Sequence, residues 1–145
     1  MEQLAPILVA VDFSHLSPRS VEYAVRLARG RNRKIDLLHV AMHTLPAHAQ
    51  AHAPTEVLDQ IRRGEEVSAL RELESLMGSL VPDELRGEIL LRRGPAADTI
   101  CSTASEGYEL VVVSTRGRTG LAHVLIGSVA ERVVRHSAVP VLVVR

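Results

Sequence analysis

The chain has 145 residues, and its 17 lysine and arginine side chains are balanced by 17 acidic ones, so its formal net charge at pH 7 is zero. This balance provides no overall basic field for nucleic acid and no acidic excess of the kind found in disordered chains. The length fits a single domain, residues 1–145. Phe13, Tyr23 and Tyr108 are too few aromatic residues to stack against single-stranded nucleic acid.

The cysteine content and the N-terminus favour a cytoplasmic protein. Cys101 is the single cysteine, so it cannot form an internal disulfide, and core packing is its simplest role. The first six residues carry no basic stretch followed by an apolar segment. No apolar run reaches the length needed to span a membrane, so we expect no membrane association.

The chain is predicted to open with a strand and a helix. Residues 7–11 form a continuous apolar run that ends in Asp12, as is typical of a parallel strand buried on both faces. Ser17 and Pro18 then match an N-cap and a first-turn proline, and apolar residues repeat at helical spacing until Gly30. Asp12 is therefore expected at the C-terminal end of the first strand.

A second strand is predicted over residues 35–41, with His39 as a core residue whose hydrogen bonds are satisfied. Residues 42–54 lack an apolar period and are predicted to form a mobile loop. Three histidines lie in this loop: His43, His48 and His52. The last two have a spacing that suits a metal on a helix, but no carboxylate or cysteine accompanies them and two prolines oppose a helix. We therefore expect a solvated loop and no metal site.

A long amphipathic helix is predicted over residues 57–80, with a solvated charged face and a weak point at Gly64. Residues 88–92 form a third strand whose charged ends suit the edge of a sheet. Gly94 and Pro95 then open a third helix.

The fourth strand, residues 110–113, leads into a loop that carries three glycines and two arginines before a helix over residues 129–136. Glycine lets backbone amides approach a ligand, and a helix start presents unpaired N–H groups, so a phosphate fits there. Ser128 and Glu131 also match a capping box, in which the two side chains would satisfy those amides themselves. The two interpretations compete for the same donors, and the loop alone leaves both open.

With a last strand over residues 139–144, five strands alternate with four helices, which predicts an α/β fold with a doubly wound parallel sheet. Ligands of such sheets lie beyond the C-terminal strand ends, where the winding reverses. The first and fourth strands are the best candidates because one ends in Asp12 and the other in the glycine loop. If these strands are neighbours, a nucleotide is the leading ligand, with Asp12 on a ribose hydroxyl or a metal-bound water.

Five segments point to a known family: VAVDFS at 9–14, LHV at 38–40, GPA at 94–96, the loop at 114–128 and PVLVV at 140–144. Through them the chain resembles the universal stress protein family over essentially its whole length. In the nucleotide-binding branch of that family, a glycine, two residues, a second glycine and nine residues precede Gly-Ser or Gly-Thr. This chain matches from Gly117 onward, whereas Ser114 replaces the first glycine.

The resemblance implies a five-stranded sheet in the order 3-2-1-4-5 and the binding of ATP, or ADP or AMP, with Mg²⁺. The residues expected around the nucleotide are Val11, Asp12, Val40, Ser114, Arg116, Gly117, Gly127, Ser128 and Val129. Asp12 and the backbone of Val40 would flank the adenosine. The two glycines, Ser128 and the residue after it would hold the phosphates.

The resemblance also implies a regulatory protein of the stress response that works as a nucleotide-dependent homodimer. The last strand, which starts at Val139 and ends at Val144, is apolar on both faces and lies at a sheet edge that pairing of two copies would cover. Two alternatives are a dimeric interaction module that binds no nucleotide and a slow ATPase. No general base is evident beside the loop except His123, so we expect weak hydrolysis at most.

Overall fold

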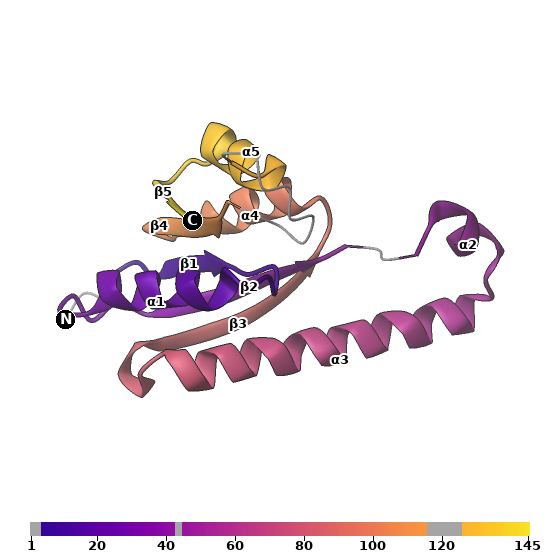
Figure 1. Ribbon diagram of the computed structural model, residues 1–145, viewed down its shortest axis with the longest axis horizontal. Helices are drawn as coiled ribbons and strands as arrows, with labels where there is room; N and C mark the ends of the chain where they lie inside the picture. Colours follow the sequence, from indigo (N-terminus) through magenta and orange to yellow (C-terminus); the bar gives the residue numbers. More distant parts are fainter. Residues whose placement is uncertain (1–3, 43–44, 116–125) are drawn as a thin grey trace.

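The computed structural model describes residues 4–42, 45–115 and 126–145. In chain order its elements are β1 (Ile7–Ala10), α1 (Ser17–Ala28), β2 (Ile35–Ala41), α2 (Ala47–His52), α3 (Thr55–Leu80), the 3₁₀ turn η1 (Asp83–Leu85), β3 (Arg86–Arg93), α4 (Ala96–Ala104), β4 (Leu110–Ser114), α5 (Ser128–His136) and β5 (Val141–Val144) (Figure 1). Within these ranges, no helix is both long and apolar enough to cross a membrane.

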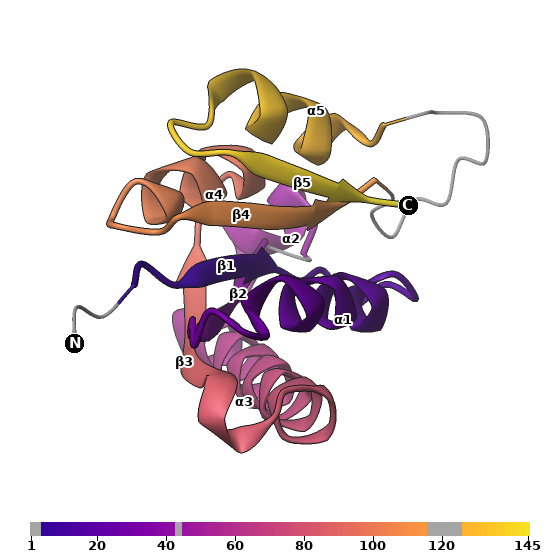
Figure 2. The same cartoon turned by 90° about the vertical axis from the view of Figure 1, so that its left-hand side faces the viewer.

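The five strands form one sheet in the order β3-β2-β1-β4-β5, and all neighbouring pairs are parallel. Helices α1 and α3 cover one face, and α4 and α5 cover the other; Figure 2 shows α1 and α5 on opposite sides of the strands. The predicted fold and strand order are therefore confirmed, as is the edge position of β3. The last strand is shorter than expected, because pairing with β4 begins at Val141.

The central strands are apolar throughout because both faces of the sheet are covered. Ile7 and Val9 of β1 pack toward α1 and α3, whereas Leu8 between them packs toward α4 and α5. All three are almost fully buried. A strand with two buried faces needs no polar alternation, which explains the continuous apolar runs.

A short helix, α2, lies in the segment where the sequence predicts a loop. Pro46 and Pro54 directly precede α2 and α3, at positions where a missing N–H removes no hydrogen bond from the helix. The two prolines therefore start helices here instead of preventing them. The prediction of a continuous loop is wrong for Ala47–His52, none of whose residues is buried.

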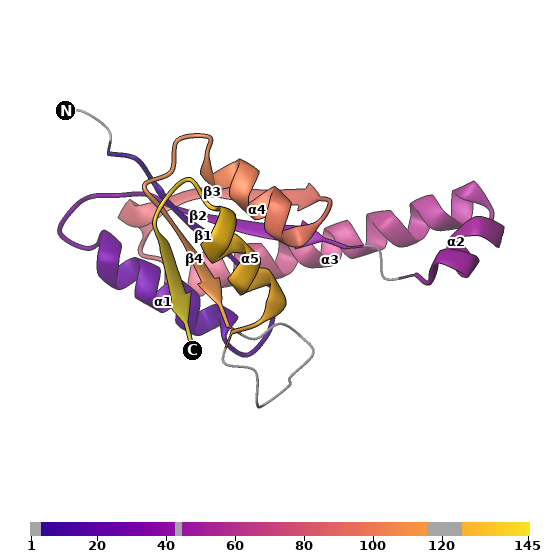
Figure 3. The same ribbon diagram turned by 90° about the horizontal axis from the view of Figure 1, so that it is seen from above.

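Helix α3 runs without interruption through Gly64, and its buried residues, Ala69, Leu73 and Met77, all lie in its C-terminal half. Its N-terminal half extends past the sheet and carries α2 beyond it (Figure 1, Figure 3). An ion pair of 2.6 Å between Glu66 and Arg93 ties the middle of the helix to the end of β3.

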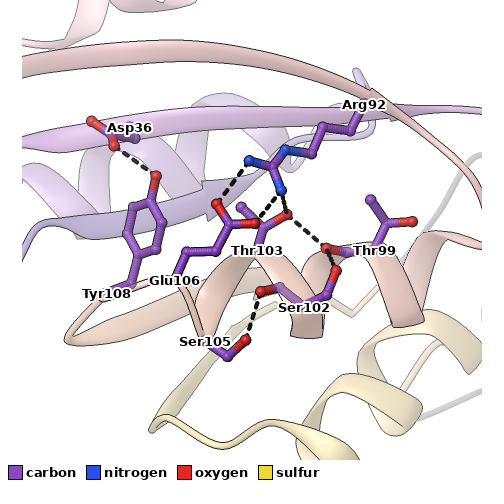
Figure 4. Close-up of polar contacts among 8 residues, drawn as sticks. All are labelled: Asp36, Arg92, Thr99, Ser102, Thr103, Ser105, Glu106 and Tyr108. Carbon is purple, nitrogen blue, oxygen red and sulfur yellow. Dashed lines mark hydrogen bonds and ion pairs between the residues drawn. The ribbon is translucent and has the colours of Figure 1, made fainter.

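A bulge gives β3 one residue more than β2 near the start of the two strands. Asp36, whose exposed fraction is 6%, fills this bulge, and its Oδ1 atom accepts the N–H of Glu88 at 2.7 Å. Its Oδ2 atom accepts the hydroxyl of Tyr108, also at 2.7 Å (Figure 4). A Cβ atom at Gly87 would lie 1.9 Å from Asp36 Oδ1, so the bulge requires glycine. Burial, together with the hydrogen bond to Asp36, raises the pKa of Tyr108.

A second polar cluster joins β3 to α4 (Figure 4). The guanidinium of Arg92 donates to both carboxylate oxygens of Glu106 and to the hydroxyl of Thr103. The hydrogen bonds between Arg92 and Glu106 raise the pKa of the arginine and lower that of the carboxyl group. Edge strand β3 is thus bordered by paired charges.

Candidate functional site

The carboxyl ends of β1, β2 and β4 meet at one edge of the sheet, with β1 between the other two. The last residue pairs are Val9 with Val112 of β4 and Ala10 with Leu38 of β2. Two residues further along each strand, Val11 lies level with Ser114, and Asp12 lies level with Val40. The structure therefore brings together four residues that the sequence places in the site. The sequence predicts that Ser114 is the first residue of a loop, but in the structure it is the last residue of β4.

The Asp12 carboxylate is half-buried and is held by the chain that follows it. Its Oδ1 atom accepts the N–H of Ser14 at 2.9 Å and the hydroxyl of Ser17 at 3.1 Å. The predicted N-cap role of Ser17 is wrong, because Leu16 occupies that position and the Ser17 hydroxyl reaches back to Asp12 instead. Within the described ranges Oδ2 accepts no hydrogen bond, so one carboxylate oxygen is left for a ligand.

His39 fixes the backbone on both sides of Asp12. Its Nδ1 atom lies 2.8 Å from the carbonyl oxygen of Val11, and its ring stacks on Phe13 with 4.3 Å between the ring centroids. Phe13 has φ of +60°, a left-handed conformation that few large residues adopt. The prediction that His39 has its partners is confirmed, whereas the sequence carries no signal for the conformation of Phe13.

Of the two interpretations of the start of α5, the capping box is wrong. Gly127 occupies the N-cap position and has no side chain to offer, and Ser128 is already the first helical residue. The Glu131 carboxylate binds Arg135 at 2.7 Å instead of reaching back. The physical reason is the anchoring of the chain at Gly127, whose N–H donates to the carbonyl of Thr115 and so sets where the helix begins.

Among the described residues, the first turn of α5 therefore presents open donors beside the end of β4. The first bond of the helix runs from the N–H of Glu131 to the carbonyl of Gly127 at 2.9 Å. The N–H groups of Ser128, Val129 and the residue after them precede this bond and have no acceptor in the helix. Ser128 and Val129 are exposed, so an anion can reach these N–H groups.

The remaining sequence-based candidates fall partly outside the described residues. Arg116 and Gly117 lie in the segment 116–125, which the structure does not describe, and so does His123. The described ends of this loop meet, since Gly127 binds Thr115 directly. The start of α5 therefore lies at the same sheet edge as Asp12.

The other residues singled out from the sequence are three histidines and Cys101. His48 and His52 belong to α2, and His43 lies outside the described residues. Among the residues with described positions, no group of three or more histidine, cysteine or acidic side chains could hold a metal. Cys101 packs against the core between the sheet and α4, in agreement with its predicted packing role.

Comparison with known proteins is consistent with this fold. Residues 4–145 match the universal stress protein family. Universal stress protein YxiE of Bacillus subtilis is 31% identical over 144 residues, which cover 96% of this chain and 97% of the relative. The solved structure of hypothetical protein MJ0577 is similar with a TM-score of 0.81 and 24% identity, covering 99% of this chain and 96% of that chain. A universal stress protein in complex with cAMP is similar with a TM-score of 0.64 and 25% identity, covering 99% and 98%.

Proposed function

This chain belongs to the universal stress protein family, and from its site we propose that it binds ATP with Mg²⁺ as a cytoplasmic regulatory protein of the stress response. The observation that carries the proposal is the open start of α5 at the sheet edge that holds Asp12. The N–H groups of Ser128 and Val129 suit phosphate oxygens, and a carboxylate at the same edge suits a sugar hydroxyl. The relative in complex with cAMP supports an adenine nucleotide as the ligand.

Each part of the nucleotide has a proposed partner. Arg116 and Gly117 join the start of α5 in holding the phosphates, because arginine forms paired hydrogen bonds with phosphate oxygens. Val11 and Ser114 lie level with each other at the ends of β1 and β4, next to the proposed ligand, and the backbone of Val40 is the proposed partner of the base.

The Asp12 carboxylate at this edge supports the proposal that Mg²⁺ accompanies the nucleotide. Mg²⁺ prefers oxygen ligands and is usually bound through one or two carboxylates, water and substrate phosphates. The Oδ2 atom of Asp12 can supply a carboxylate oxygen, directly or through a bound water. The ion would bring positive charge to the phosphates.

We also propose a homodimer paired through β5. This strand lies at a sheet edge and presents the half-buried apolar side chains of Val141, Leu142 and Val143 without a charge among them. Such an edge is prone to pair with another strand, and two copies related by a two-fold axis would cover it. The alternative function, a dimeric module that binds no nucleotide, shares this edge and differs only at the start of α5.

Calorimetric titration with ATP and Mg²⁺ tests the nucleotide proposal, together with chromatography of the supernatant from denatured protein. We expect bound adenine nucleotide in the supernatant and a measurable affinity in nucleotide-free protein. Gly127→Val should lower the affinity by about tenfold or more, because the new side chain blocks the approach of phosphate to the amides.

The φ of Gly127 is −66°, which valine also adopts, so this variant should keep the fold. Equal affinities of the wild type and Gly127→Val would contradict the assigned site. No copurified nucleotide and no heat of binding in the wild type would favour the nucleotide-free dimeric module.

A further inference from the structure

The hydrogen-bond ladder between β1 and β2 ends at Val11. In a parallel pair, a residue donates its N–H to one residue of the neighbouring strand and accepts from the residue two positions further on. The N–H of Val11 donates to the carbonyl of Leu38 at 2.8 Å. The next bond of a regular ladder would run from the N–H of Val40 to the carbonyl of Val11. This bond is not formed in the described part of the chain.

The side chain of His39 takes the place of that missing donor. Its Nδ1 atom lies 2.8 Å from the Val11 carbonyl oxygen. Because a carbonyl oxygen can only accept, we assign the proton of this contact to Nδ1. A ring N–H therefore fills the position on Val11 that a regular ladder would give to the Val40 peptide.

The following bond of the ladder is also missing, and His39 contacts the residue responsible. A regular ladder would continue from the N–H of Phe13 to the carbonyl of Val40, and this bond too is not formed among the described residues. Phe13 has φ of +60°, which turns the chain away from the strand direction. The Phe13 ring stacks on His39 at 29° between the ring planes, so the histidine also supports this turn.

Val40 is consequently left with a donor and an acceptor at the open edge. Strand residues bond alternately to their two neighbours, and Leu38 bonds to β1, so the N–H and C=O of Val40 also point to the β1 side. Asp12 lies level with them. A donor and an acceptor on one peptide match a planar base that carries an acceptor next to an amino group, as the N1 and N6 positions of adenine do.

We propose that His39 is a positioning residue that ends the β1–β2 ladder at Val11 and thereby leaves the Val40 peptide for the base of the ligand. The identity of the ligand rests on the proposed function. The opening of the ladder does not, because it follows from contacts within the chain, those of His39 with Val11 and Phe13.

Amide hydrogen exchange, measured by NMR on nucleotide-free protein, tests the opening of the ladder. In the wild type, the Val40 amide should exchange at least tenfold faster than that of Leu38, which lies in the paired part of β2. His39→Phe keeps a ring for stacking but removes the donor, so Val40 can bond to Val11 and its exchange should slow by about tenfold. His39→Asn keeps an N–H donor near the position of Nδ1 and should leave Val40 in fast exchange.

Two exchange results would overturn the inference. One is a wild-type Val40 amide as protected as that of Leu38. The other is a folded His39→Phe protein in which Val40 exchanges as fast as in the wild type. The wild-type comparison decides whether the ladder is open, and the two His39 variants decide whether His39 opens it.

Titrations with ATP and with inorganic tripolyphosphate, both with Mg²⁺, test the consequence for the ligand. His39→Phe should bind ATP about tenfold more weakly and tripolyphosphate as the wild type does, because only ATP has a base. Equal losses for both ligands, or an unchanged ATP affinity with Val40 protected, would overturn the role of His39. A wild type that binds neither ligand would refute the proposed function, and the exchange rates would still decide the state of the ladder.

Discussion

Asp36 and Asp12 each accept one backbone N–H and one hydroxyl, but the two carboxylates lie at opposite ends of the sheet and distribute these bonds differently. Asp36 uses both oxygens, one for Glu88 and one for Tyr108, and is buried. Asp12 receives both bonds on Oδ1 and is half-buried. In Asp36 both carboxylate oxygens have hydrogen-bond partners within the protein, whereas in Asp12 the Oδ2 atom is left for a ligand.

The backbone shows the same contrast. At the start of β2, a side chain replaces a ladder partner and repairs the sheet, because Asp36 accepts the N–H that the bulge leaves without a strand partner. At the end of β2, His39 replaces a ladder partner and opens the sheet, because it occupies Val11 and leaves Val40. A side chain that replaces a strand partner can thus satisfy a peptide group, as Asp36 does, or leave one without a partner among the described residues, as His39 does, depending on which peptide group it binds.

The side edges of the sheet differ in a related way. Edge strand β3 carries Arg92 and Arg93, which pair with Glu106 and Glu66. Edge strand β5 is apolar. Charged side chains protect an edge from pairing, so β5 is the edge that favours a partner.

The largest expected effect is on the apolar edge. Val143→Lys should convert a dimer into a monomer, because it places an unpaired charge in the proposed interface. Sedimentation at tens of micromolar should show about twice the chain mass for the wild type and the chain mass for the variant. A matched change on the charged edge, Leu91→Lys, should leave the dimer intact. A monomeric wild type or a dimeric Val143→Lys protein would refute pairing through β5.

A side chain at position 87 should disrupt the bulge near the start of β2 and β3. Its new Cβ in Gly87→Ala would lie 2.8 Å from the carbonyl oxygen of Ile35 as well as against Asp36, so the bulge has to distort. We expect a loss of about 3 kcal/mol in the free energy of unfolding, measured with urea. Gly64→Ala is the matched control: nothing lies within 4 Å of its added Cβ, and it should stabilise α3 by about 0.5 to 1 kcal/mol. A Gly87→Ala protein as stable as the wild type would contradict the closed bulge.

At the carboxyl edge of the sheet, removal of the Asp12 carboxylate should affect ligand binding and not folding. A lost hydrogen bond to a charged group costs about 1.5 to 3 kcal/mol, so Asp12→Ala should weaken ATP binding by about tenfold or more. Asp36→Ala should do the opposite, lowering the free energy of unfolding with little change in affinity. Calorimetry and urea unfolding of both variants would separate the two roles. If Asp12→Ala binds ATP like the wild type, Asp12 is not in the site.

The smallest effect concerns the exposed pair of Glu106 and Arg92. Hydrogen bonding to Arg92 lowers the pKa of Glu106, so its stabilising contribution is present above the ordinary glutamate pKa of about 4.3 and is lost as the pH falls through the lower folded value. Glu106→Gln should be slightly less stable than the wild type at pH 7. At about pH 3 the difference should shrink, as thermal unfolding at both pH values can show. A constant difference would indicate a packing effect and not a charge effect.

Much of the fold follows from patterns along the chain. Apolar runs with buried faces identify the strands, and the position of Asp12 after the first run places it at the carboxyl edge of the sheet, as the structure also does. The strand order came with the family resemblance and agrees with the structure. These features are readable because periodicity and strand ends depend on local sequence.

The features that the sequence did not predict depend on contacts between distant segments of the chain. The capping box fits the sequence at Ser128, but the bond between Gly127 and Thr115 moves the N-cap by one residue. The role proposed for His39 depends on which peptide groups of β2 face β1, and that is set by the register of the two strands. No spacing rule within one segment contains this information.

The bond between Gly127 and Thr115 also bears on how this fold can change over evolution. It joins the two ends of the loop between β4 and α5 to each other, so the strand and the helix do not rely on the loop's interior for their spacing. The entropy of closing a flexible loop grows slowly, by about 0.6 kcal/mol for each doubling of its length. Insertions and deletions between Thr115 and Gly127 should therefore cost the fold little free energy, and related chains can differ in the length of this loop while keeping the sheet unchanged.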